Sequence, residues 1–97
     1  MNSEECKAFI DCLTYEDCTI RLYGKVYWCL GLTYNEATGQ WTIGVYECEG
    51  CTPVFSRQLF LYTSRRKDEC MNHFLEECYW NGKSFYEVVS EITWVDL

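Results

Sequence analysis

Four strand-length segments, separated by short polar turns, fill the middle of the sequence between residues 18 and 62. They are rich in β-branched and aromatic residues, which favour strands. They cover residues 18–23, 26–34, 41–48 and 54–62. Gly24-Lys25 predicts a two-residue hairpin turn, and Gly39 lies where the next, longer turn needs a positive φ. Strands joined in this way predict an antiparallel meander.

Helical periodicity precedes this region. Residues 2–13 show apolar residues at spacings of three and four, which predicts one buried helix face. These residues are Cys6, Phe9, Ile10 and Leu13. Asn2 and Glu5 form a capping-box pattern at the start of the helix. The opposite face is polar and carries Glu4, Glu5, Lys7 and Asp11.

A second helical pattern follows the strands. It covers residues 65–79, with Thr63 or Ser64 as N-cap and Asn81-Gly82 as the stop signal. Its predicted apolar face carries Cys70, Met71, Phe74, Leu75 and Cys78. Ser84 and Glu87 then form another capping box, which predicts a short helix to about Ser90. Residues 92–95 favour a terminal strand that joins the sheet.

These elements predict an α+β fold in one domain spanning residues 1–97. We expect an antiparallel meander sheet of four or five strands. An N-terminal helix and one or two C-terminal helices pack on one of its faces.

The charge balance narrows the function classes. Fifteen acids and eight bases give a net charge of −7, whereas a direct nucleic-acid binder needs a basic footprint. No apolar run approaches the roughly 18 residues that span a bilayer. The first residues are acidic and lack the apolar segment of a signal peptide. We therefore expect no contact with nucleic acid or membrane, and a cytoplasmic location.

Eight cysteines in a short chain can indicate a disulfide scaffold. That interpretation requires an oxidising compartment, to which nothing in the sequence directs the chain. The five Phe, eight Tyr and four Trp can also form a hydrophobic core that does not need disulfide bonds. We interpret most cysteines as reduced, small core residues. Cys70 and Cys78, eight residues apart on one helix face, are too distant to bond to each other.

Cys48 and Cys51 form a C-x₂-C motif, and three interpretations are open. Two thiolates at this spacing can bind one zinc ion, but a structural site needs two more ligands. A redox pair needs a basic environment, whereas Glu47 and Glu49 flank the motif. The third interpretation is a hairpin turn with two incidental cysteines. We predict no metal and no cofactor, with Cys48 and Cys51 as the candidates for zinc.

Catalytic patterns are missing from the sequence. His73 has no accompanying nucleophile motif and is interpreted as a surface or boundary residue. The basic cluster at residues 65–67 can bind a phosphate or an acidic partner, or be balanced by Asp68 and Glu69. No nucleotide-binding glycine loop or Ser/His/Asp order occurs. We therefore expect a protein that is not an enzyme.

Acidic and aromatic side chains are the candidates for binding a partner. Acids can present charge to a basic cleft. Because helices cover one face of the sheet, some strand tyrosines should be exposed on the other, and exposed tyrosines are common in interfaces. The candidate partner-binding residues are Glu4, Glu5, Asp11, Glu16, Asp17, Glu47, Glu49, Tyr27, Tyr34 and Tyr46.

The segments 80–87 (WNGKSFYE) and 91–96 (EITWVD) look like a family signature. In size, charge and order of elements, the chain resembles small acidic inhibitors of phages and mobile elements, among them type II-A anti-CRISPR proteins. The resemblance covers most of the chain. It implies a non-catalytic inhibitor that occupies the basic DNA-binding groove of a nuclease as a DNA mimic, or another anti-defence protein. The alternative is a small structural module, either zinc-binding or homo-oligomerising; the protein is then a monomer or a homodimer.

Overall fold

The computed structural model describes residues 1–48 and 55–95. The elements in chain order are α1 (Ser3–Leu13), β1 (Cys18–Leu22), β2 (Lys25–Asn35), β3 (Gln40–Cys48), β4 (Phe55–Ser64), α2 (Lys67–Glu76), α3 (Phe85–Val88), η1 (Val89–Glu91, a 3₁₀ helix) and β5 (Thr93–Val95). The α+β class is as predicted. Residues 49–54, which include the predicted turn at 49–53, lie outside the described part.

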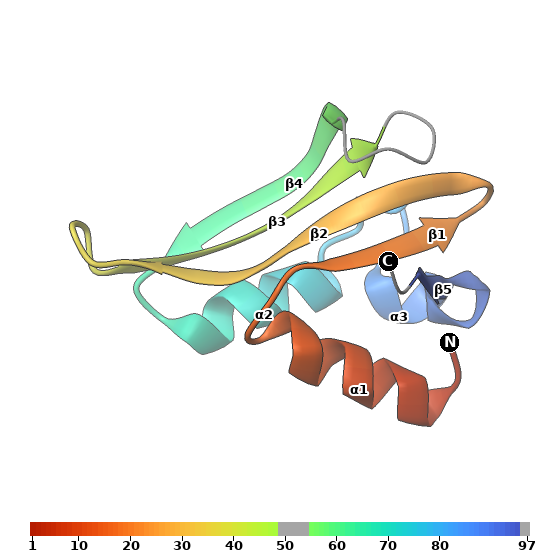
Figure 1. Ribbon diagram of the computed structural model, residues 1–97, viewed down its shortest axis with the longest axis horizontal. Helices are drawn as coiled ribbons and strands as arrows, with labels where there is room; N and C mark the ends of the chain where they lie inside the picture. The colour runs from red at the N-terminus through yellow and green to blue at the C-terminus, as the bar shows by residue number, and fades with distance from the viewer. Residues whose placement is uncertain (49–54, 96–97) are drawn as a thin grey trace.

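The five strands form one antiparallel sheet in the order β4-β3-β2-β1-β5. The meander of the first four strands and the terminal strand at its edge are both confirmed. The helices that the structure describes all lie on the same side of the sheet (Figure 1). Within the described ranges, none of these helices is long and apolar enough to cross a membrane.

The core lies between this sheet and the helices. Phe9 of α1 stacks on Phe85 of α3 with 5.7 Å between ring centroids, and Phe85 also contacts Phe74 of α2 at 5.4 Å. All three rings are fully buried, as are Ile43 and Val45 of β3 on the sheet side of the core. The capping box of Asn2 and Glu5 and that of Ser84 and Glu87 both form as predicted. The helix patterns in the sequence therefore position the aromatic core correctly.

The first hairpin turn differs from the prediction by one residue. Its central residues are Tyr23 and Gly24, both at positive φ (52° and 76°), and Lys25 already pairs with Leu22. Two consecutive positive φ angles match the twist of a tight hairpin. The Tyr23 hydroxyl donates to Glu91 Oε2 at 2.5 Å, a contact that sequence reasoning could not foresee. Gly39 has the predicted positive φ of 70°.

The boundaries predicted for the second helix are wrong at both ends. Thr63 and Ser64 belong to β4, and Arg66 is the N-cap without a side-chain cap bond. The helix ends at Glu76, so the exposed Cys78 lies beyond it and not on its apolar face. Asn81-Gly82 does not stop the helix but forms a turn of positive φ between Trp80 and Lys83, which pair as an isolated bridge.

The pairing of β1 with β2 begins at Cys18 and Cys29, and β2 continues past this point. The connection from α1 to β1 lies beside this longer part of β2. Asp17 Oδ1 accepts the backbone N–H of Gly31 at 2.8 Å, so the carboxylate satisfies a strand donor where β1 does not reach. A Cβ atom at Gly31 would lie 2.3 Å from the Glu16 carbonyl oxygen. Only glycine fits this crossing.

Candidate binding surfaces

Acidic charge is concentrated in the helices. Each helical segment carries a formal charge of −2: α1 from Glu4, Glu5, Asp11 and Lys7, α2 from Asp68, Glu69, Glu76 and Lys67, and α3 with η1 from Glu87 and Glu91. The strands contain three bases, Arg21, Lys25 and Arg57, against one acid, Glu47. We call the α1, α2 and α3–η1 segments the acidic helical layer. The three segments lie together on one side of the sheet, and the core is between them and the sheet (Figure 1).

The three candidate acids of α1 all point outward. Glu4, Glu5 and Asp11 are exposed. Glu5 also caps its own helix, because its Oε1 accepts the backbone N–H of Asn2 at 3.1 Å. Glu4 and Asp11 make no side-chain hydrogen bond or ion pair with a described residue. These two carboxylates are thus available for a partner without cost to the helix.

Glu16 and Asp17 are exposed and lie in the connection between α1 and β1. Glu16 Oε1 is 3.2 Å from Cys12 Sγ, which donates to it. Asp17 is exposed but holds the Gly31 N–H described above. Asp17 therefore has a structural role, and its replacement would test the fold as well as binding.

Glu47 is not a freely presented acid. It forms ion pairs with Lys25 Nζ at 3.0 Å and with Arg57 Nε at 3.1 Å, and its side chain is 14% exposed. The hydrogen bond from Lys25 lowers the pKa of Glu47, partial burial opposes this shift, and the charges of Lys25 and Arg57 reinforce it. Its charge is balanced within the sheet. Glu49 lies outside the described residues.

The three candidate tyrosines separate into different environments. Tyr27 is 7% exposed and packs edge-on against Trp80 at 5.3 Å, so it is buried in the core and does not have the exposure expected of a strand tyrosine on the outer face. Strand alternation turns it toward the helices. Tyr34 is 48% exposed and contacts the Trp41 ring at 5.0 Å. Tyr46 is half-buried on the other side of the sheet.

Tyr46 lies on the surface of the sheet opposite the core, because its neighbour Val45 points into the core. Cross-strand pairing aligns Trp28 with Tyr46, and Leu30 with Gly44 and Leu61. We call this surface the open sheet face; its residues are Arg21, Trp28, Leu30, Gly44, Tyr46 and Leu61. A hollow of about 410 Å³ is lined by Trp28, Leu30, Tyr46 and Asp17. Beside it, Leu61 is 45% exposed.

Sequence reasoning overlooked Trp28, Leu30 and Leu61 as surface residues. A half-exposed strand normally alternates apolar and polar residues. In β2 the side chains on both faces of the strand are apolar. Tyr27 and Cys29 face the helices, while Trp28 and Leu30 face outward. That double pattern was the available signal for an apolar outer face.

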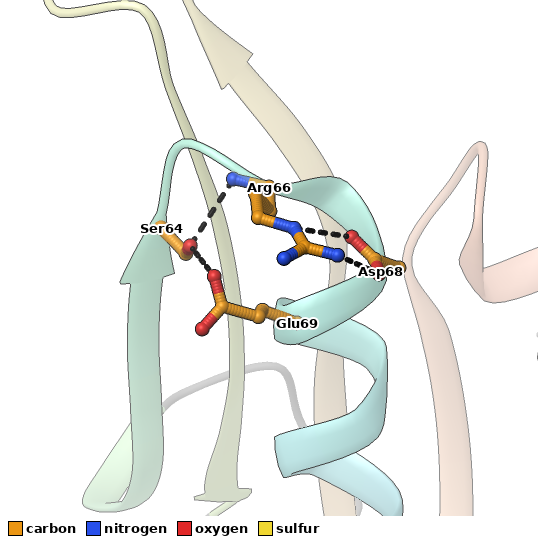
Figure 2. A network of polar contacts seen from close by, with 4 residues as sticks. All are labelled: Ser64, Arg66, Asp68 and Glu69. Carbon is orange, nitrogen blue, oxygen red and sulfur yellow. Dashed lines mark hydrogen bonds and ion pairs between the residues drawn. The ribbon is translucent and has the colours of Figure 1, made fainter.

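Within the basic cluster at residues 65–67, Arg66 is paired with an acid of the same chain. Arg66 binds Asp68 through Nη2 at 2.9 Å, and its backbone N–H donates to Ser64 Oγ at 3.1 Å (Figure 2). Ser64 Oγ in turn donates to Glu69 Oε2 at 2.9 Å. Arg66 lowers the pKa of Asp68 by this hydrogen bond. The predicted balance by neighbouring acids is confirmed for Arg66.

Lys67, at the start of α2, interacts with aromatic rings. Its Nζ lies 5.0 Å from the Trp41 ring centroid and 5.5 Å from that of Tyr15. These cation–π contacts connect the start of α2 to β3 and to the segment that follows α1.

Of the two cysteines in the zinc hypothesis, Cys48 is described and Cys51 lies outside the described residues. Cys48 is buried, and burial raises the pKa of its thiol. Within residues 1–48 and 55–95, no group of three or more His, Cys, Asp or Glu residues is arranged to hold a metal ion. Cys18, Cys29 and Cys70 are buried as predicted for core cysteines.

His73 occupies the predicted boundary position. Its ring stacks on Tyr62 with centroids 3.9 Å apart, and Nδ1 lies 2.5 Å from Glu77 Oε2. The arrangement fixes the ring on the surface of α2.

The described residues thus present two different surfaces on opposite sides of one sheet, one acidic and one apolar. Both suit binding to another macromolecule. Comparison of the chain with protein-family models, curated proteins and solved structures found no match.

Proposed function

We propose that this protein is a non-catalytic inhibitor that acts in the cytoplasm by binding a basic protein through its acidic helical layer. The observation that carries the proposal is the charge distribution. Each of the three helical segments has a formal charge of −2, and they share one side of the sheet. A surface of this kind attracts a basic cleft and competes with the phosphates that the cleft normally binds.

The specific partner that we propose is a nucleic-acid-binding enzyme, with a type II-A CRISPR nuclease as the first to test. The resemblance to anti-CRISPR inhibitors in size, charge and order of elements supports this choice. In this proposal the protein occupies the DNA-binding groove stoichiometrically, and no residue of the protein undergoes chemistry.

The first experiment titrates the protein into a type II-A nuclease loaded with guide RNA and measures both binding and cleavage of target DNA. We expect one protein per nuclease to block cleavage, and affinity to fall steeply between about 0.05 M and about 0.3 M salt. Binding that is insensitive to salt, or that leaves DNA cleavage unchanged, would contradict the mimicry.

A charge-neutralising variant tests which surface is used. Glu4→Gln, Asp11→Asn and Glu76→Gln together remove three exposed carboxylates that make no side-chain contact with described residues. At about 0.5 kcal/mol for each exposed ion pair, the triple variant should bind the nuclease about tenfold more weakly. Glu36→Gln is the matched control, because Glu36 is exposed in the turn between β2 and β3, outside the helical layer. An equal loss per charge in the control would place binding elsewhere.

A further inference from the structure

We infer that the groove between α1 and the α3–η1 segment binds an amphipathic, basic helix of the partner. Two apolar side chains of that helix, one turn apart, enter the groove, and its Lys and Arg side chains meet the acids of the two walls. The groove belongs to the acidic helical layer. The inference therefore names the segment of the partner that this layer binds, and it rests on the proposed function.

Two contacts hold the walls of the groove together. In the core, Phe9 of α1 stacks on Phe85 of α3, as described above. The amine of Met1 donates to the carbonyl oxygens of Val89 and Ile92 at 2.7 and 2.6 Å, which fixes the start of α1 against η1. Between the two walls a hollow of about 450 Å³ remains.

The lining of the groove is mainly apolar. Cys6 and Ile10 line it from α1, and Tyr86 and Val89 line it from α3–η1. Cys6, Ile10 and Val89 are partly buried, whereas Tyr86 is 56% exposed. Apolar side chains of this kind lose contact with water when a partner fills the groove, which favours binding.

The length of the groove suits two turns of a helix. Its lining on α1 extends from Ser3 to Ile10, a rise of about 10 Å. Side chains at positions i and i+4 of a docked helix are about 6 Å apart along the axis, so two of them fit into this length. Grooves between helices bind amphipathic helices through anchors at such spacing, whereas an extended strand needs the edge of a sheet.

Acidic side chains beside the groove determine the charge of the helix that fits. Glu4 and Asp11 are three residues before and four residues after Lys7, which lines the groove, so all three share one side of α1. Glu4 and Asp11 are exposed and make no side-chain hydrogen bond or ion pair with a described residue. On the other wall, the exposed Glu87 follows Tyr86 in α3.

The net charge of the groove walls is negative. α1 and α3–η1 each carry a formal charge of −2, of which the amine of Met1 offsets one unit. Such walls attract Lys and Arg side chains and repel a fatty acid or an anionic lipid headgroup. An apolar lining between negative walls thus fits a basic amphipathic helix.

The test measures binding of a synthetic peptide of about 14 residues, or four helical turns, by fluorescence anisotropy. The peptide has Leu at spacings of three and four and Lys at the other positions, and its control has the same residues in an order without an apolar face. We expect one amphipathic peptide to bind per chain, and the control to bind at least about tenfold more weakly. Equal binding of the two peptides would overturn the inference.

Tyr86→Ala tests whether the peptide lies in the groove. We expect about tenfold weaker binding, because the variant removes the most exposed apolar side chain of the lining. The matched control is Tyr15→Ala, since Tyr15 is 78% exposed and does not line the groove. Circular dichroism confirms that each variant is folded. Binding that Tyr86→Ala leaves unchanged would contradict the assignment.

Lys7→Glu provides a second variant, at an exposed residue, with an effect in the opposite direction. It replaces the cation between Glu4 and Asp11 with a third acid, so the basic peptide should bind about threefold more tightly. Weaker or unchanged binding by Lys7→Glu would place the peptide outside the groove.

The same variants in the nuclease titration separate this inference from the proposed function. Salt-sensitive binding of the nuclease that is unaffected by Tyr86→Ala would overturn the groove as docking site and leave the inhibitor proposal intact. Peptide binding that depends on Tyr86, together with no binding of the nuclease, would support the groove and overturn the nuclease as its partner.

Discussion

At the scale of single residues, Gly31 shows how closely the chain crosses itself. The carbonyl oxygens of Glu16 and Leu13 would lie 2.3 and 2.9 Å from a Cβ at this position, and Asp17 binds its N–H. Backbone atoms cannot rotate away as the end of a side chain can. The position therefore ties the end of α1 to the middle of β2.

Gly31→Ala should destabilise the protein by about 1–3 kcal/mol, the usual cost of forcing atoms into a packed site. Urea unfolding followed by circular dichroism measures it. Gly44→Ala is the control, because one of its two nearest neighbours is the flexible end of Leu61 at 3.1 Å. Equal losses in the two variants would show that the crossing at Gly31 can relax.

Tyr79 is one of the buried groups that should make the folded protein less stable at alkaline pH. Its hydroxyl donates to the Phe74 carbonyl at 2.7 Å, and burial raises its pKa far above the ordinary value. Burial also raises the pKa of the thiols of Cys18 and Cys29. In the unfolded chain thiols ionise near pH 8.5 and tyrosine near pH 10. The folded protein thus keeps protons that the unfolded chain releases, and its stability is complete below these values and falls as pH rises.

The free energy of unfolding should therefore decrease from about pH 8.5 upward and more steeply above about pH 10. Tyr79→Phe should be less stable than the parent at neutral pH, because a hydrogen bond is lost, yet have a shallower decline above about pH 10. Tyr15→Phe, at a residue 78% exposed, is the control and should leave the slope unchanged. Urea titrations across this pH range would reveal a contrary slope.

At the scale of elements, α2 begins without the side-chain cap that the sequence predicted. Ser64, the last residue of β4, still acts on the helix from a distance. Its hydroxyl accepts the Arg66 N–H and donates to Glu69, so one side chain connects a strand end with the first turn (Figure 2).

Ser64→Ala should cost about 1 kcal/mol, comparable with the loss of an N-cap. The change should appear in the urea midpoint and not in its slope. Ser90→Ala, at an exposed residue of η1, is the matched control and should change stability by less than about 0.5 kcal/mol. A neutral Ser64→Ala would mean that solvent replaces both hydrogen bonds.

The elements were the most predictable part of the structure, for reasons that are local. Asn2 with Glu5 and Ser84 with Glu87 placed two helix starts, since a capping box depends on residues three apart. The ends of α2 were misplaced because β4 continues through Thr63 and Ser64, where pairing with Thr42 and Trp41 outweighs capping preference. The turn at Tyr23 shifted because register, which sequence does not show, decides which residues are central.

At the scale of the whole molecule, the candidate site was harder to predict than the fold. The acids of α1 were correctly placed outward, since helical spacing assigns a face. Tyr27 and Glu47 were not, because strand alternation alone does not show which set of side chains meets the helices. The separation into an acidic side and an apolar side arises from three-dimensional packing of segments distant in sequence.

The strand order has a consequence for how the sheet assembles. From β1 to β4 each strand pairs with its neighbour in sequence, whereas β5 pairs with β1 through Arg21 and Thr93. This last pairing closes a loop of roughly 70 residues, whose entropy must be lost before the contact forms, which makes it slow. Until then the outer edge of β1 has unpaired backbone groups, a template for another chain. We therefore expect the short β5 to cover this edge late in folding and so to limit pairing with other chains.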